Sequence, residues 1–273
     1  YTTGVVKDDS AYLTTITIAS GVANLYYYCQ SHSGMGAEIR TNETHGSTNF
    51  DGSLLSVSNT NTTAGFSIIT STSPSSGTWS VGHGLNSTPD FIIQKYSSAG
   101  TRWTVWHNTL TSGQYLGLNE TTQVQSSGTP FNFTFNDTVI GGNADYEATS
   151  KEVLYFAFNE VEGYSKFGVY TANGLADGNF VYTGFRPAWL MIRKTDGSGA
   201  TWWIVDAVRD IDNPVAKYLM SDSPNQESNG SDYTTADFLS NGFKIRNTST
   251  AFNSGTHIYI CFAESPFKYA NAR

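Results

Sequence analysis

Three side chains that can bind copper follow one another closely in the segment "YYYCQSHSGMG": Cys29, His32 and Met35. A thiolate, an imidazole and a thioether form the ligand set of blue-copper electron-transfer sites, in which the methionine is a weak axial ligand. These residues are the metal-ligand candidates of the chain. The alternative is a strand and loop of the same kind that holds no metal.

Two pairs of tryptophans are candidates for binding. Trp103 and Trp106 lie in "RWTVWHN", and Trp202 and Trp203 lie in "TWWIVDA". Successive residues of a strand face opposite sides, so one member of each pair should enter a core while the other could reach the surface. An exposed indole can stack on the apolar face of a sugar ring. All four are therefore glycan-binding or interface candidates. The competing interpretation is that both members of each pair are buried or lie in an inter-domain or inter-subunit contact.

Two histidines stand close to strand ends, His83 in "VGHGLNSTP" and His107 in "WTVWHN". Neither has a Cys, Asp or Glu at ligand spacing. A later, similar part of the chain has Thr183 and Asp206 at the corresponding positions. A base or a metal ligand would not ordinarily tolerate such replacement, so we expect structural roles at a turn and a strand end.

The acidic residues give no pattern for catalysis. Glu160 and Glu162 share a strand face in "EVEGY", but the repeat of that segment reads "ESPFK". Aspartates that could bind calcium in loops are also typical turn residues; they are Asp177, Asp196, Asp210 and Asp212. The motifs G-x-S-x-G, H-E-x-x-H and G-x-x-x-x-G-K-[ST] are absent. We therefore expect neither an enzyme nor a bound cofactor.

Composition narrows the function classes. Charged residues form 14% of the chain, where about a quarter is typical, and Gly, Ser, Thr and Asn fill the difference. The formal net charge of −8 disfavours nonspecific binding to nucleic-acid phosphates, which requires Lys and Arg. No apolar run reaches the roughly 18 residues of a membrane span, so membrane insertion is not expected. Cys261 is expected to be a buried thiol, and the start at Tyr1 suggests part of a longer polypeptide.

Strands must position all these residues. Apolar segments rich in Val, Ile, Thr, Tyr and Phe recur about every 8–14 residues between Gly, Ser, Asn, Asp and Pro, and helix periodicity is absent. The segment "PDFIIQKYSSAGTRWTVWH" from Pro89 reappears about 100 residues later as "PAWLMIRKTDGSGATWWIVD" from Pro187. Likewise, "EVLYFAFNE" from Glu152 matches "HIYICFAES" from His257. This indicates an internal duplication.

The predicted fold class is all-β, with two tandem antiparallel β-sandwich domains of jelly-roll-like type. The expected domains are 65–163 and 164–273, joined tightly by "NEVEGYSKFG" because that segment is short and lacks a flexible Gly/Ser run. Residues 1–64 are expected to form a partial β module, with a polar connector leading into the first sandwich.

The sequence also resembles known families. "LYYYCQSHSGMG" resembles the C-terminal ligand loop of pseudoazurin-like cupredoxins, with two departures. Ala37 stands five residues after His32, where the axial methionine belongs, and a second histidine would fall about 40 residues upstream, before Tyr1. What this resemblance implies is a cupredoxin-like fragment without a functional metal.

The segments "VGHGLNSTPDFIIQK", "EGYSKFGVYTANGLADGNFVYTGFRPAWLMIRKTD" and "IYICFAESPFKYANAR" resemble domains near the C-termini of structural proteins of tailed marine bacteriophages, including cyanophages. The resemblance implies a virion protein on the particle surface, a tail fibre or other appendage subunit. Together with the tryptophan candidates, this leads us to expect a subunit that contacts host surface glycans. The alternatives are a capsid decoration or head-fibre protein with a purely structural role, and a glycan depolymerase. Expected partners are other virion proteins and further copies of the chain, as a homotrimer.

Overall fold

A computed structural model describes residues 5–8, 10, 13–16, 25–28, 36–39, 46–75, 77–111, 113–126, 134–143, 150–197, 200–228 and 235–265. The chain divides into two compact units, Tyr1–Ser47 and Thr48–Arg273. Across the described ranges every regular element is a strand, so the predicted all-β class is confirmed. The same ranges contain no helix with the length and apolar character needed to cross a membrane.

The first unit contains two antiparallel strand pairs. β1 (Val5–Asp8) pairs with β2 (Leu13–Ile16), and β3 (Leu25–Tyr28) pairs with β4 (Gly36–Ile39). The copper-ligand candidates Cys29, His32 and Met35 fall between β3 and β4, outside the described residues.

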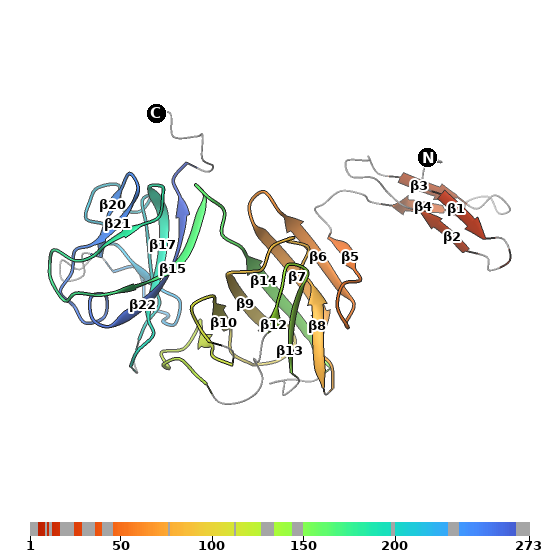
Figure 1. The fold of residues 1–273 in the computed structure, drawn as a ribbon, viewed down its shortest axis with the longest axis horizontal. Coiled ribbons are helices and arrows are strands. Elements are labelled where there is room, and N and C mark those ends of the chain that lie inside the picture. Colours follow the sequence, from red (N-terminus) through yellow and green to blue (C-terminus); the bar gives the residue numbers. More distant parts are fainter. Residues whose placement is uncertain are drawn as a thin grey trace. The chain divides into compact units, whose positions relative to one another are not determined.

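The second unit begins with a sandwich of two sheets (Figure 1). The larger sheet has seven strands in the order β11-β10-β9-β14-β7-β6-β5, and the smaller has three in the order β12-β13-β8. The bounds in the larger sheet are β5 (Ser47–Asn49), β6 (Ser56–Asn61), β7 (Phe66–Thr72), β9 (Phe91–Tyr96), β10 (Thr104–His107), β11 (Leu116–Gly117) and β14 (Glu152–Phe158). Those in the smaller sheet are β8 (Thr78–Gly82), β12 (Thr134–Phe135) and β13 (Val139–Asn143).

A second sandwich follows. Its larger sheet has the order β15-β22-β17-β18-β19 and its smaller sheet the order β16-β21-β20. The bounds are β15 (Ser165–Thr171), β16 (Phe180–Tyr182), β17 (Pro187–Lys194), β18 (Trp203–Asp206), β19 (Leu219–Met220), β20 (Ala236–Leu239), β21 (Gly242–Ile245) and β22 (Thr256–Ala263).

The two sandwiches have the same topology. Each strand of the second sandwich has a counterpart at the same place in the strand order of the first. The strands β7, β8, β9, β10, β11 and β14 correspond in turn to β15, β16, β17, β18, β19 and β22. The pair β12 and β13 likewise corresponds to β20 and β21. Among the described strands, the first sandwich adds β5 and β6 at one edge of its larger sheet. The structure thus carries the duplication that the repeated segments indicated.

The start of the first sandwich differs from the prediction. The sequence predicts a polar connector before residue 65, whereas β6 pairs with β7 over its whole length. The strand "SVSNTN" is almost entirely polar, and Ser56 is its one buried residue. Because half-buried strands are recognised by alternating apolar residues, a polar strand near a sheet edge carries no such signal. The first sandwich therefore includes residues that were expected to be loop.

Three apolar clusters hold the second unit together. One fills the first sandwich around Ile69, Trp79 and Tyr155, and another fills the second sandwich around Trp203, Phe243 and Tyr259. The third contains residues of both sandwiches, among them Phe91 and Ile260. We call this third cluster the junction core.

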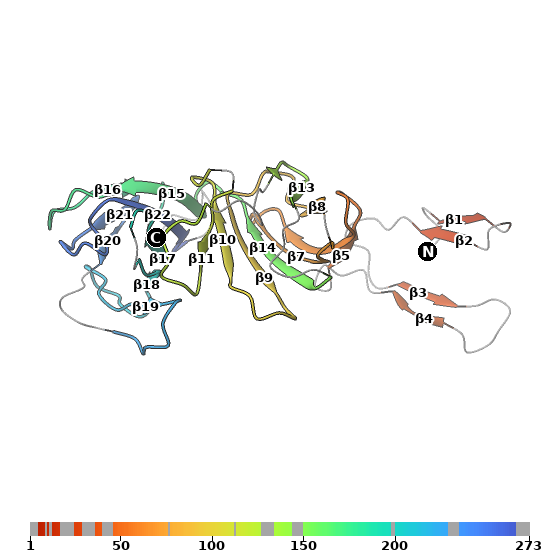
Figure 2. The same cartoon turned by 90° about the horizontal axis from the view of Figure 1, so that it is seen from below.

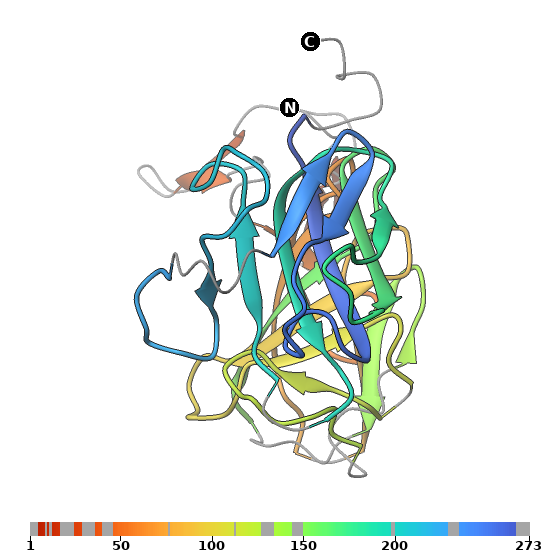
Figure 3. The same cartoon turned by 90° about the vertical axis from the view of Figure 1, so that its left-hand side faces the viewer.

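The junction core exists because the larger sheet of the second sandwich buries both of its faces. Leu190 and Cys261 point into the sandwich interior, while Met191 and Ile260, one position along, point into the junction core. The strands of this sheet run across those of the first larger sheet (Figure 3). Continuous apolar runs such as "IYICF" are what a strand buried on both faces requires.

Candidate functional site

The tryptophans of the second copy lie in the interior. Trp202 is fully buried in the junction core, and its Nε1 donates a 2.8 Å hydrogen bond to the carbonyl oxygen of Gly117. Trp203 belongs to the core of the second sandwich, where its ring lies 4.4 Å from that of Phe252 between centroids. Neither indole can stack on a sugar, so this pair follows the competing interpretation, in which both members are buried. Trp202 also lies in the contact between the two sandwiches.

The tryptophans of the first copy divide differently. Trp106 is half-buried, with its ring centroid 4.1 Å from that of Phe135. Trp103 is 36% exposed and is the one candidate of the four with a substantial free surface. The backbone N–H of Trp103, just before β10, donates to the side-chain oxygen of Asn119 at 2.9 Å, and the indole takes no part in that hydrogen bond.

A buried arginine locks the two sandwiches together. Arg193 on β17 is fully buried, and its Nη1 donates to the carbonyl oxygens of Gly117 and Glu120, at 2.7 Å each. Its Nη2 donates to the carbonyl oxygen of Thr122. Figure 2 shows β10 and β11 beside β17 and β18, where these bonds form. Burial lowers the pKa of Arg193 to about 10, so the side chain stays charged at neutral pH.

Neighbouring groups extend this lock. The guanidinium carbon of Arg193 lies 5.2 Å from the ring centroid of Trp202, a cation–π contact made stronger by the burial of both side chains. The Ser221 hydroxyl donates to the carbonyl oxygen of Leu118 at 2.6 Å. Segment 117–122 of the first sandwich is thus held through its carbonyl oxygens by side chains of the second.

A histidine also crosses the junction. His107 is fully buried at the end of β10, and its Nδ1 accepts a hydrogen bond from the backbone N–H of Thr109 at 3.2 Å. The proton therefore sits on Nε2, which faces the carbonyl oxygen of Tyr259 at 3.4 Å. Burial lowers the pKa of His107 to about 4. This neutral, doubly engaged ring has the structural role expected from the sequence.

His83 is held in the same way within the first sandwich. Its Nδ1 accepts from the N–H of Leu85 at 3.1 Å, and its Nε2 faces the carbonyl oxygen of Asn136 at 3.0 Å. Burial lowers its pKa. Both ring nitrogens are engaged with backbone, so neither is left to act as a base.

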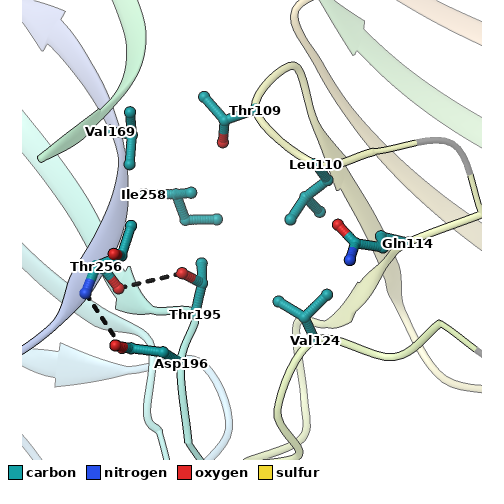
Figure 4. A pocket seen from close by; sticks show the side chains of 9 residues that line it. All are labelled: Thr109, Leu110, Gln114, Val124, Val169, Thr195, Asp196, Thr256 and Ile258. Atoms are coloured by element: carbon teal, nitrogen blue, oxygen red, sulfur yellow. Dashed lines mark hydrogen bonds between the residues drawn. The ribbon is translucent and has the colours of Figure 1, made fainter.

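A cleft opens on one side of the junction (Figure 4). Its volume is about 380 Å³, and both sandwiches contribute to its walls. The lining residues are Thr109, Leu110, Gln114 and Val124 of the first sandwich and Val169, Thr195, Asp196, Thr256 and Ile258 of the second.

The polar groups of this cleft are engaged with one another. Asp196 accepts from the N–H of Thr256 at 3.1 Å, and the Thr195 hydroxyl donates to the carbonyl oxygen of Thr256 at 3.1 Å. Leu110 and Ile258, which belong to the junction core, form its apolar part. The described residues that line the cleft include no aromatic ring and no nucleophile beside a base. It is where two sandwich surfaces diverge above the junction core.

A smaller apolar groove opens elsewhere along the junction, with a volume of about 240 Å³. It is lined by Phe91, Ile93, Leu118, Phe158, Trp189, Met191, Ile204, Ser221, Ile260 and Phe262. Rings from the two sandwiches meet around it: Phe158 and Phe262 lie 6.1 Å apart between centroids. The groove is a part of the junction core that reaches the surface.

The acidic candidates serve turns and ion pairs. Asp210 accepts hydrogen bonds from the N–H groups of Ala216 and Lys217, at 2.7 and 3.2 Å, and Glu160 forms an ion pair with Lys166. Within the described part of the chain, no three His, Cys, Asp or Glu side chains gather as a metal site would require. The turn interpretation of these residues agrees with this geometry.

Comparison with known families gives one finding. A family model described as "Domain of unknown function (DUF7483)" matches residues 39–266. The chain belongs to this family. The DUF7483 match runs from the last residue of β4 to just beyond β22, so the family unit contains both sandwiches and the junction between them. In comparisons with curated proteins and with solved structures, none matches this DUF7483 chain.

Sequence reasoning did not identify Arg193 as a structural residue. The signal was present, because Arg193 follows the apolar run "AWLMI" within a predicted strand. A charged residue in such a run is either at an exposed end or buried with partners. The partners are backbone carbonyl oxygens of a distant segment, which a sequence does not display.

Proposed function

We propose that this DUF7483 protein is a non-enzymatic structural protein of a bacteriophage virion, a tail-fibre or surface-appendage subunit that contacts host surface glycans. The junction core is the observation that carries this proposal. Two sandwiches that share a buried interior and a buried arginine behave as one stiff block, as an appendage that transmits force must. The segments that resemble structural proteins of tailed marine phages add support.

The chemistry of the described residues supports a role without catalysis. His83 and His107 are buried and bonded to backbone on both ring nitrogens, and Glu160 is paired with Lys166. A general base needs a free lone pair and access to substrate. A depolymerase would also need two carboxyl groups facing one bound sugar across a short gap.

The proposed setting is the outer surface of the particle. There the partners would be other virion proteins, further copies of this chain in a homotrimer, and host polysaccharide. The net charge of −8 fits a protein that keeps away from nucleic acid. Stiff sandwiches with few charged side chains also suit an extracellular structure.

Labelling intact particles tests the proposal. Antibody fragments raised against residues 48–273 should decorate the tail or its appendages in electron micrographs of the phage that encodes the chain. The purified chain should also compete with phage for adsorption to host cells. Decoration of the capsid without competition would favour a capsid decoration protein, and absence from particles would refute a virion role.

A polysaccharide digestion assay addresses the depolymerase alternative. The purified chain is incubated with host surface polysaccharide, and reducing ends are measured over time. We expect no release above that of a heat-denatured sample. Steady release that survives further purification would overturn the non-enzymatic assignment.

A further inference from the structure

Two aromatic side chains stand exposed on the outer face of the second sandwich. Phe180 and Tyr182 on β16 are 46% and 66% exposed, while Val181 between them is buried in the core. Residues two apart on a strand lie about 6.6 Å from each other on the same face. β16 is an edge strand of the sheet β16-β21-β20 (Figure 2), so the two rings lie at the margin of that face.

The same face carries charged side chains that neutralise one another. Lys244 stands opposite Phe180 in the sheet, and its Nζ binds Asp177 at 2.5 Å. Arg246 binds Asp177 at 2.9 Å through Nη1 and Asp237 at 2.9 Å through Nε. These ion pairs lower the pKa of Asp177 and keep it ionised. In the part of this face that the structure describes, these two cations and two anions balance one another.

A glycine lets one ring lie close to the sheet. Gly242 stands opposite Tyr182, and a Cβ at Gly242 would approach the ring of Phe180 to 3.0 Å and the carbonyl oxygen of Val181 to 2.1 Å. The Phe180 ring therefore leans over the backbone of β21. We call Phe180, Tyr182 and the bare backbone of Gly242 the aromatic platform.

The duplicated copy shows that the fold does not need these rings. Aligning "SVGHGL" with "FVYTGF" places Ser80 and Gly82 at the positions of Phe180 and Tyr182. In the first copy the chain itself covers them. Ser80 exchanges hydrogen bonds with Ser53, and the side chain of Asn49 lies 2.2 Å from where a Cβ of Gly82 would be. In the second copy the corresponding positions carry large aromatic rings exposed to solvent.

We propose that the aromatic platform binds uncharged hexopyranose rings of a host surface polysaccharide. This inference rests on the proposed function and assigns the glycan contact to a place on the chain. The carbon-bound hydrogens of a pyranose face stack on aromatic rings. Beside the rings, Asp177, Lys244 and Arg246 supply fixed donors and acceptors for the hydroxyl groups of the sugar. Because the surrounding charges cancel, the face offers no attraction for a polyanion.

Affinity electrophoresis of the whole chain tests this inference. The gels contain a neutral glucan, mannan or galactan, acidic alginate, or purified host surface polysaccharide. The key variant is Phe180→Ser with Tyr182→Ser, because the first copy shows that the fold tolerates small residues at these positions. We expect retardation by at least one neutral polymer and binding weakened at least about tenfold in the double variant. Phe50→Ser removes a ring that is 81% exposed elsewhere and serves as the matched control. Thermal unfolding of all three proteins confirms folding.

The outcomes separate the two proposals. If the wild-type chain binds a polysaccharide and the double variant binds it equally well, the aromatic platform is refuted while the proposed function stands. If the wild-type chain binds none of the polymers, the glycan part of the proposed function fails together with this inference. Binding to alginate alone, lost in salt, would refute a site for neutral sugars. A change of oligomeric state in the double variant by sedimentation would identify the face as a contact between copies and overturn the inference.

Discussion

Replacing Arg193 by methionine should destabilise the junction while the rest of the core stays intact. The substitution keeps an unbranched side chain but removes the donors for the carbonyl oxygens of Gly117, Glu120 and Thr122. Hydrogen bonds from a charged donor contribute about 1.5–3 kcal/mol each, so the three bonds give roughly 4–9 kcal/mol. Burial of the guanidinium opposes this: a pKa lowered from 12.5 to about 10 corresponds to about 3 kcal/mol at 1.36 kcal/mol per pH unit. The expected net loss is about 1–6 kcal/mol.

Denaturant unfolding followed by tryptophan fluorescence measures this loss, since Trp202 lies against Arg193. The wild-type second unit should unfold in one transition, and the variant should unfold earlier and in two steps as the sandwiches separate. Arg186→Met is the control, because Arg186 forms a partly exposed ion pair with Glu264 at 3.0 Å, and such pairs contribute less than about 1 kcal/mol. If both variants lose the same stability, or if Arg193→Met loses less than about 0.5 kcal/mol, the junction lock is refuted.

Three further predictions concern buried groups. The pKa of His107 falls from 6.5 to about 4 on folding, so the unfolded chain binds a proton first as the pH is lowered. The free energy of unfolding should therefore drop by about 3 kcal/mol between pH 6.5 and 4. The stability advantage of wild type over His107→Gln should narrow over that range, and a constant difference would contradict the burial of a neutral His107. Trp202→Phe should cost about 1–2 kcal/mol, since it removes one of the two hydrogen bonds to the carbonyl oxygen of Gly117 and leaves space where the larger indole packed. Trp103→Phe should change stability by less than about 0.5 kcal/mol. Equal losses of the two variants in chemical denaturation would be inconsistent with the different burial of the two side chains. In a Cys29→Ser background, Cys261 should resist thiol reagents at pH 8 until the protein unfolds, because burial raises the pKa of its thiol; rapid labelling of the native protein would show that the strand is accessible.

Much of the fold could be predicted because its strands alternate or run continuously apolar. The repeated segments from Pro89 and Pro187 became β9–β10 and β17–β18, in equivalent places of two sheets. Some strands were not predicted, among them β6 and β13. β6 is polar, and β13 contains Gly141 and Gly142, which weaken any strand signal. Gly142 is needed because the ring of Trp79 occupies the place of its side chain, at 2.9 Å from where a Cβ would be.

The candidate site was harder to predict, because alternation tells which face a residue is on and not what covers that face. Trp202 was expected to reach either solvent or an interface, and the first sandwich covers it. Phe180 and Tyr182 were seen only as part of a strand. Their signal lies in the comparison of copies, where Ser80 and Gly82 stand in equivalent positions. A large exposed side chain that is present in one copy and absent from the equivalent position of the other points to a role outside folding.

The burial of β22 on both faces has a consequence for how such proteins can evolve. Every residue from His257 to Cys261 is buried, although a freestanding sandwich would turn alternate residues of this strand to water. A gene fragment encoding the second copy alone would yield a protein with a bare apolar sheet and a strong tendency to aggregate. A gene exchange that yields a folded protein must therefore carry both sandwiches together. New binding specificities then have to arise in the outer sheets and loops of the two sandwiches.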